Sequence, residues 1–236
     1  MESDVLALAV SDPTPKPGNA RGRRTRAQLV DAATACFGEY GYERTRIQDI
    51  VTRAGVSQGN FYRHFESKRE IFLEALKPGL EDLLEARAGL QDHTDADALA
   101  ADTVLYLRTY SRHRHILRVM REAAAVRSDG FDELWLQLRS NFVARTQGWL
   151  ERLHADGRIG DGDFPQLAAV LGAMVEQVAY VQIGLPDRTP RDEEIQRIAR
   201  VIGDVWHRAL PPVPRKAANT RTANPKTANK KPPAKK

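Results

Sequence analysis

The chain has 236 residues, of which 42% are hydrophobic and 28% are charged. This composition supports a folded core and excludes a wholly disordered protein. The single cysteine, Cys36, excludes an intramolecular disulfide and favours a reducing compartment. The sequence contains neither an uninterrupted apolar run of about 18 residues nor a signal-peptide pattern, so we expect a cytoplasmic protein with no membrane partner.

The charge is unevenly distributed along the chain. The formal net charge is +5, but residues 211–236 hold eight of the 36 basic residues and no acidic residue. Residues 21–70 carry ten basic and six acidic groups, whereas residues 71–210 are acidic overall. A small basic block therefore precedes a larger acidic one, and the Lys- and Pro-rich tail at 211–236 is expected to be disordered.

The first helix is expected to follow a polar, proline-broken segment at residues 1–20, for which disorder is the default. From Thr25 onwards, apolar residues recur at steps of three and four, which predicts one buried helical face. Gly38 and Gly41 provide a stop near its end. The apolar positions are Leu29, Ala32, Ala33, Cys36, Phe37 and Tyr40.

Two short helices are predicted next. Thr45 offers an N-cap to a helix that ends at Gly55, and its buried side consists of Ile47, Ile50 and Val51. Ser57 offers an N-cap to the following helix, on which Phe61 and Phe65 are four residues apart and share the inward face.

Six longer helices complete the predicted fold. Ser67 and Glu70 form a capping box at the start of the first of them, and Pro78-Gly79 is expected to kink or break that helix near its middle. Turn-forming residues separate the segments, and no segment shows sustained strand alternation, so the fold is predicted to be all-α with nine helices. The six spans are 68–90, 96–111, 113–127, 131–155, 163–184 and 192–209.

The two short helices and their three-residue turn form a helix-turn-helix, in which Gly55 permits the turn and the second helix lies in the DNA major groove. On the outer side of that helix, Gln58 and Asn60 can each make paired hydrogen bonds to adenine, and Gly59 allows a close backbone approach. Donors for phosphate oxygens are the side chains of Tyr62, His64 and Lys68 and the helix N-termini at Ser57 and Ser67. One more polar helix face is the competing interpretation.

Residues 23–76 carry a longer ordered pattern than a helix-turn-helix alone. A first helix ending in FGEYGYERT is followed by I-x-x-I-V-x-x-AGVS, and then by NFYRHFESK and an apolar IF. This pattern resembles the TetR family of bacterial transcriptional regulators. The resemblance implies a homodimeric repressor that binds a double-stranded DNA operator, with a helix-turn-helix DNA-binding domain at residues 21–67 and a ligand-binding and dimerisation domain at residues 68–210.

The resemblance also implies roles for particular residues. The positions implied to read bases are Gln48, Gln58, Gly59 and Asn60. The positions implied to contact phosphates are Thr45, Tyr62, His64 and Lys68. Arg63 touches either a base or the backbone, and four further arginines begin the first helix, where they either reach the DNA backbone, with Arg23 and Arg24 as candidates, or form a solvated start. These are Arg21, Arg23, Arg24 and Arg26.

The resemblance further implies an effector cavity and a dimer seam in residues 68–210. The expected effector is a small, largely apolar molecule, although plain core explains the same inward side chains. The candidate pocket residues are Tyr106, Tyr110, Leu117, Met120, Trp135, Leu138, Phe142, Met174 and Val178. The candidate seam residues are Leu167, Leu171, Val175, Ile195, Ile198, Ile202 and Trp206. Glu176 and Gln177 supply polar contacts in the pocket or lie at the seam.

Catalytic and metal-dependent functions find little support in the sequence. His113 and His115 are two apart on a helix and point in different directions, so no metal is expected. The sequence has no phosphate-cradling Gly-rich loop and no nucleophile elbow, so we expect neither an enzyme nor a cofactor. The remaining alternative is a helical architectural or adaptor protein that binds DNA without an effector.

Overall fold

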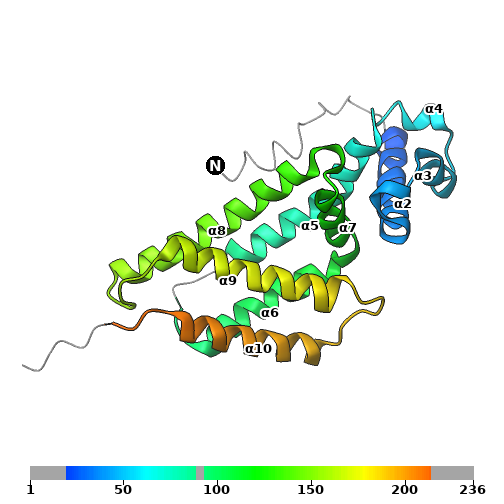
Figure 1. Cartoon of the computed structure of the whole chain (residues 1–236). Coiled ribbons are helices and arrows are strands. Elements are labelled where there is room, and N and C mark those ends of the chain that lie inside the picture. The colour runs from blue at the N-terminus through cyan, green and yellow to red at the C-terminus, as the bar shows by residue number, and fades with distance from the viewer. Residues whose placement is uncertain (1–19, 89–92, 214–236) are drawn as a thin grey trace, which may run out of the picture.

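The computed structural model of the protein describes residues 20–88 and 93–213, and every regular element in these ranges is a helix (Figure 1). The prediction of an all-α fold is confirmed. Nearly all of the two segments predicted to be disordered, and the end of the helix predicted at 68–90, lie outside the described residues.

The first helix, α2 (Ala20–Arg44), begins five residues earlier than the apolar pattern indicates. Gly41 interrupts its geometry with φ 77° and ψ 171°, a conformation that a residue without a Cβ adopts freely. This bend changes which side chains face inward: Tyr40 is exposed, while Tyr42 is buried and stacks on Phe37 with ring centroids 5.7 Å apart. The inward face predicted to include Tyr40 therefore closes on Tyr42 instead.

The two short helices are α3 (Ile47–Ala54) and α4 (Gln58–Phe61). Gly55 joins them in the left-handed conformation, with φ 67°, as the turn requires. Ser57 caps α4, because its Oγ accepts a hydrogen bond from the Asn60 N–H over 3.2 Å. The second helix is shorter than expected, since turns follow Phe61, yet Phe61 and Phe65 are both buried as predicted.

Thr45 does not cap α3, although the sequence predicts that it does. Its side chain is buried, and its hydroxyl lies 2.7 Å from the Gly41 oxygen and 3.2 Å from the Cys36 oxygen, so it ties α3 to the bent end of α2. The helix begins after Arg46, whose N–H donates to the Asp49 carboxylate over 2.8 Å. Because its hydroxyl is buried and bonded to oxygens of α2, Thr45 does not cap α3.

The long helix α5 (Lys68–Ala88) leads from the helix-turn-helix end of the molecule into the larger bundle. It starts as predicted, with Ser67 Oγ accepting from the Glu70 N–H over 3.1 Å. The helix continues past Pro78, as the predicted span 68–90 implies, so of the expected kink or break the break does not occur. Gly79 is buried, and a Cβ added to it would lie 3.1 Å from the Cβ of His113, which explains the need for a small residue here.

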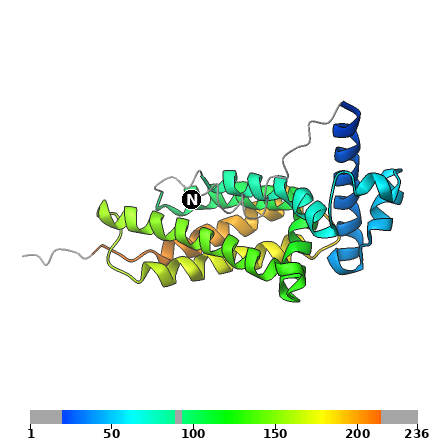
Figure 2. The same ribbon diagram turned by 90° about the horizontal axis from the view of Figure 1, so that it is seen from above.

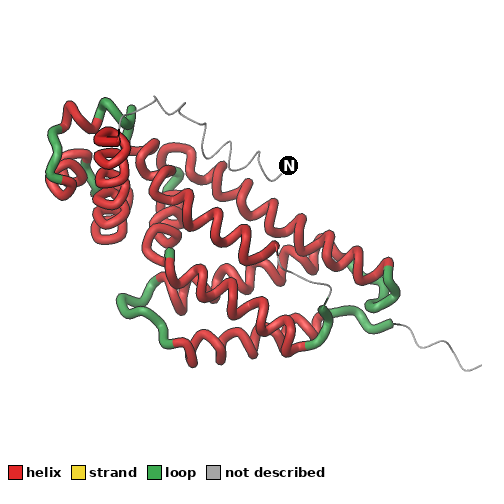
Figure 3. The backbone as a smooth tube through the Cα atoms, turned by 180° about the vertical axis from the view of Figure 1, so that it is seen from behind, coloured by secondary structure: helices red, strands yellow, loops and turns green. Residues whose placement is uncertain are grey.

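The larger bundle has five more helices (Figure 2), and their ends fall within two residues of the predicted spans except at α9, whose α-helical part ends five residues before 184. A 3-10 turn (Ser128–Gly130) separates α7 from α8, and a π-helical turn (Tyr180–Gly184) extends α9. Helix α10 lies along α6, and α8 lies along α9 (Figure 3). The helices are α6 (Ala96–Arg112), α7 (Arg114–Ala125), α8 (Phe131–Ala155), α9 (Phe164–Ala179) and α10 (Asp192–Ala209).

Close contacts lock the last helix into this bundle. A Cβ added to Gly203 of α10 would lie 2.6 Å from the backbone oxygen of Ala96 in α6, so the two helices touch backbone to backbone there. The buried guanidinium of Arg114 donates hydrogen bonds to three backbone oxygens of the loop before α10, at distances of 2.5 to 2.8 Å. The accepting residues are Pro186, Asp187 and Arg188.

Residues 164–184 are long and apolar enough to cross a membrane by length and composition alone, with a mean hydropathy of 1.4 over an 18-residue window. One third of that window is buried inside the protomer, where α9 packs against α8. A core helix of a soluble protein passes the same test, so this helix is weak evidence for a membrane segment.

Candidate nucleic-acid interface and ligand pocket

The outer side of the helix-turn-helix carries the residues predicted to read bases. Gln58, Gly59 and Arg63 are exposed at and just after α4, and Asn60 is half-buried beside them. A Cβ added to Gly59 would meet no atom within 4 Å, so the space above it is open to a partner. Gln48 is exposed on α3, with its amide 3.3 Å from the Thr52 hydroxyl. The fold thus presents these groups outward, and base reading stays a prediction.

Two of the predicted phosphate contacts lie on an exposed or half-exposed surface. Tyr62 is 53% exposed, with its ring edge against the buried Phe61 ring. His64 is half-buried, and burial, followed by the charges of Arg63 and Arg26, holds the pKa of its imidazole below the usual value. The side chain is therefore neutral at pH 7, and a neutral imidazole donates a single N–H bond.

The structure gives Thr45 and Lys68 structural roles instead of phosphate contacts. The Thr45 hydroxyl is buried between two helices, out of reach of DNA. The ammonium of Lys68 donates to the Tyr42 oxygen over 3.0 Å and lies 4.3 Å from the centroid of the Tyr42 ring. A cation in this place satisfies a carbonyl group at the end of α2 and interacts favourably with its dipole. Both phosphate assignments are therefore corrected.

The arginines at the start of α2 divide into two groups. Arg21, Arg23 and Arg24 are exposed on the first turns of the helix. Arg26 is held instead: its Nη1 lies 2.7 Å from the Glu74 carboxylate in α5, and its guanidinium lies over the Phe65 ring, 5.0 Å from the centroid. Arg26 thus joins α2 to α5, and contact of the earlier, exposed arginines with DNA stays a prediction.

A cavity inside the larger bundle gathers seven of the nine side chains expected at an effector pocket. It lies between α5, α6, α7, α8 and α9 and has a volume of about 70 Å³. Ligand pockets usually enclose ~300 to 1000 Å³, so a ligand of that size would have to displace lining side chains. The seven are Tyr106, Tyr110, Leu117, Met120, Trp135, Leu138 and Phe142.

Helix α9 turns a different face to the cavity from the one predicted. Gly172, Ala173 and Glu176 line it, whereas Met174 and Val178 lie half-buried on neighbouring faces. The apolar stripe of α9 marked Met174 and Val178, but two of the residues that face the cavity are small and one is charged. Periodicity of large apolar residues therefore selected the wrong face.

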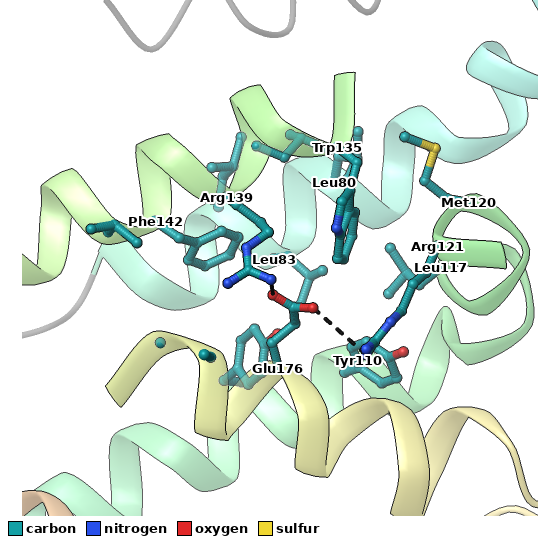
Figure 4. A pocket seen from close by; sticks show the side chains of 16 residues that line it. Leu80, Leu83, Tyr110, Leu117, Met120, Arg121, Trp135, Arg139, Phe142 and Glu176 are labelled. Atoms are coloured by element: carbon teal, nitrogen blue, oxygen red, sulfur yellow. Dashed lines mark ion pairs between the residues drawn. The ribbon is translucent and has the colours of Figure 1, made fainter. Parts of the chain in front are cut away.

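The polar part of the cavity is an ion-pair triad of two arginines and one glutamate (Figure 4). A carboxylate oxygen of Glu176 lies 3.2 Å from Nη1 of Arg139 in α8, and the other lies 3.6 Å from Nη1 of Arg121 in α7. The sequence prediction missed both arginines. Arg121 lies four residues after Leu117, and Arg139 four after Trp135, so the helical spacing that marked their apolar neighbours places them on the same faces.

Most residues expected at a dimer seam are buried within the protomer instead. Trp206 is one example: its ring centroid lies 5.8 Å from that of Trp149 in α8. Leu167 and Ile198 are only half-buried against the core. The strongest apolar stripe of each helix thus faces the core of its own protomer. The buried residues are Leu171, Val175, Ile195, Ile202 and Trp206.

A second, weaker apolar stripe on α9 and α10 faces outward. Val170 and Val201 are 56% and 60% exposed, and Val181 and Val205 are also exposed. Val201 and Val205 are four residues apart on α10, and Val170 and Val181 are eleven apart on α9 and the π-helical turn that extends it, so each pair lies on one face. We call these four valines the outward stripe.

The larger bundle touches the helix-turn-helix end through α5, α7 and the turn after α7. Arg118 of α7 donates from Nη2 to the Gly38 oxygen of α2 over 3.0 Å. The Tyr42 hydroxyl of α2 donates to the Asp129 carboxylate, and Arg69 Nε of α5 donates to the backbone oxygen of Asp129 over 2.9 Å. Since α5 and α7 also line the cavity, two helices contact both the cavity and the helix-turn-helix end.

The histidines at positions 113 and 115 lie in different surroundings. Within residues 20–88 and 93–213, no three His, Cys, Asp or Glu side chains are grouped so that they could hold a metal ion. His113 contacts the Asp82 carboxylate over 2.8 Å, while His115 is exposed on α7. The two histidines thus point apart, as their spacing predicts.

Comparison with known proteins bears on residues 29–75 above all. These residues match the family model described as bacterial regulatory proteins, tetR family. The chain is 38% identical over 87 residues to the transcriptional activator FasR of Mycolicibacterium smegmatis, across 34% of this chain and 40% of that protein. The chain spans half or less of the length of several curated relatives that it matches.

Two longer matches extend beyond the helix-turn-helix. The chain is 27% identical over 179 residues to a transcriptional repressor of Mycobacterium tuberculosis, across 75% of this chain and 88% of that protein. The solved complex of SmeT with triclosan has a TM-score of 0.62 at 24% identity and covers 89% of this chain and 100% of that chain. The structural likeness shows that the whole described chain shares this fold.

Proposed function

Because the chain belongs to the tetR family of bacterial regulatory proteins, we propose that it is a homodimeric transcriptional repressor that a small, largely apolar effector releases from a palindromic operator. One observation carries this proposal: a helix-turn-helix with outward Gln58, Gly59 and Asn60 is joined through α5 and α7 to a cavity lined mostly with apolar side chains.

The reading of DNA bases is assigned to α4. Gln58 and Asn60 offer amide groups that can pair with adenine in the major groove, and Gly59 keeps the backbone close to the bases. The N–H groups at the start of α4, Tyr62, Arg24 and the neutral His64 are assigned to phosphates, which position the protein without reading sequence.

Dimerisation is assigned to the outward stripe of α9 and α10. These apolar side chains form rows on two neighbouring helices. When a second copy covers them, apolar surface is removed from water, which is favourable. A two-fold dimer would place two copies of α4 about 34 to 36 Å apart, in successive major grooves. The operator is therefore expected to be a palindrome.

Effector release is assigned to a shift of α7. Leu117, Met120 and Arg121 of this helix line the cavity, and Arg118 lies between them on the side that holds α2. The cavity of about 70 Å³ is small, so an effector would displace α7 or its neighbours and with them the DNA-binding end. A coupling of ~1 to 3 kcal/mol would weaken DNA binding by one or two decades.

Selection of bound fragments from genomic DNA tests this function. We expect the full-length protein to enrich one palindromic sequence, with affinity at least ~10³-fold above that for unrelated duplex. Repeating the selection with apolar metabolites should remove the enrichment for one of them. Equal affinity for every duplex would instead indicate an architectural DNA-binding protein without an effector.

A further inference from the structure

We propose that the effector is an amphipathic organic anion, whose carboxylate binds between Arg121 and Arg139 while its apolar body fills the rest of the cavity. This inference rests on the proposed function and names the chemical class of its effector. The cavity is apolar except for its charged triad, in which two guanidinium groups face one carboxylate. The charged lining therefore carries one unbalanced positive charge.

The three charged side chains come from three different helices and converge on one place (Figure 4). Glu176 of α9 lies between Arg139 of α8 and Arg121 of α7. Arg121 is held firmly: its Nη2 donates to the Gln177 side chain over 2.6 Å, and its guanidinium lies 4.0 Å from the centroid of the Tyr180 ring. The site is thus preorganised before any ligand enters.

The triad leaves one donor without an acceptor. Nη1 of Arg121 is fully buried and makes no hydrogen bond, because the Glu176 oxygen at 3.6 Å is beyond hydrogen-bonding distance. A buried donor without a partner is destabilising, more so for a charged group. A ligand carboxylate beside Arg121 and Arg139 would accept this hydrogen bond and balance the charge.

Other ligand charges fit the lining less well. A cationic ligand would have to displace an arginine from the single carboxylate. A neutral apolar ligand would leave the Arg121 donor buried and unsatisfied. The small cavity volume favours a carboxylate over a larger phosphate head group, and the apolar body would contact Leu80, Leu83 and Trp135.

Burial also affects one of the two phenol groups in the lining, that of Tyr110. It raises the pKa of the Tyr110 phenol, so this group keeps its proton at neutral pH and can donate a hydrogen bond to an anion. The polar lining therefore offers two guanidinium cations and one phenol O–H to a ligand carboxylate. The Glu176 carboxylate competes with the ligand for the two guanidinium groups.

The test is calorimetric titration of the full-length protein with straight-chain carboxylates of about six to about fourteen carbons and with the matching alcohols and amines. We expect at least one carboxylate to bind ~10-fold or more tightly than its alcohol and its amine. Arg139→Met should remove most of that advantage, measured as the ratio of carboxylate to alcohol affinity within the variant, whereas Arg139→Lys should retain part of it. Glu176→Gln should tighten carboxylate binding several-fold, since it removes the competing carboxylate.

Arg152→Met, an exposed change on the same helix outside the cavity, is the matched control. Thermal melts of every variant show whether each one folds. Equal affinities for carboxylate and alcohol would overturn the inference, as would tighter binding of an amine that Glu176→Gln abolishes, or no binding by any carboxylate. In each of these cases the proposed function survives if an alcohol, an alkylammonium ion or another compound releases the operator, because operator selection without ligand is a separate measurement.

Discussion

Arg118 of α7 donates a hydrogen bond from Nη2 to the backbone oxygen of Gly38 in α2 over 3.0 Å. This bond joins α7, one of the helices that line the cavity, to the first helix of the helix-turn-helix end. Arg118 itself does not line the cavity, but its neighbour Leu117 does. A movement of α7 is therefore felt by α2 through this bond. The relationship gives a direct test of how the two ends communicate.

Arg118→Met should reduce the effect of an effector on DNA binding. We expect effector affinity to stay within about 2-fold of wild type, while the effector-induced loss of operator affinity falls by ~10-fold or more, since one hydrogen bond from a charged donor is worth ~1.5 to 3 kcal/mol. Operator titrations with and without effector measure this. Unchanged coupling in a folded variant would show that α7 communicates through other contacts, such as that between Tyr42 and Asp129.

Lys68→Met should lower stability and leave the salt dependence of DNA binding unchanged. The ammonium of Lys68 is held by the Tyr42 oxygen and ring, so its loss removes a cap from α2 and a cation–π contact. We expect a loss of ~1 to 3 kcal/mol in the free energy of unfolding, measured by chemical denaturation. A flatter salt slope with unchanged stability would instead restore Lys68 as a phosphate contact.

Asn60→Ala and Arg24→Gln should weaken DNA binding in different ways. Loss of the Asn60 amide should cost ~1 to 3 kcal/mol on the operator and relax preference at one base pair, with little change on unrelated DNA. Loss of the exposed Arg24 charge should weaken binding to all sequences and reduce the salt slope by ~1. Binding measured over a salt series on operator and scrambled duplex separates the two effects. The reverse pattern would exchange their assigned roles.

Val201→Glu should disrupt the dimer. Val201 is 60% exposed on the outward stripe, so a charge there is tolerated by the protomer fold but would be buried without a partner at a two-fold seam. We expect monomers in sedimentation at micromolar concentration and a loss of operator affinity of ~10²-fold or more. Leu136→Glu, at a position 62% exposed on α8, is the control and should remain dimeric. A dimeric Val201→Glu protein would place the seam elsewhere.

DNA affinity should rise as the pH falls from about 7.5 towards the lowered pKa of His64. In the free protein, burial and two arginines hold the pKa of His64 below 6.5. A phosphate favours the imidazolium and raises this pKa in the complex, so the complex binds more protons between the two values and binding strengthens as the pH falls through that window. Operator titrations from pH 7.5 to about 5.5 measure it. His64→Gln should remove the dependence, and a dependence that persists would assign the proton to another group.

The sequence alone determined the helical architecture and the outward face of the helix-turn-helix. Helix ends followed from turn residues and caps such as Ser57 and Ser67, which act within a few residues of themselves and so can be recognised locally. Phe61 and Phe65 were correctly placed inside, because the turn between them keeps a helical hydrogen bond, from the Phe65 N–H to the Phe61 oxygen over 3.0 Å, so a spacing of four still puts both on one face.

Only the tertiary structure decided how side chains with two available partners are used. Lys68 and Thr45 match a phosphate-contacting pattern, but the bend at Gly41 brings backbone oxygens to them, and no local signal announces that contact. In the same way, α9 and α10 each carry more than one apolar stripe, and which stripe meets the core depends on α6 and α8. The ion pairs of Arg121 and Arg139 with Glu176 likewise join three helices far apart in the chain, so their convergence exists only once the bundle is assembled.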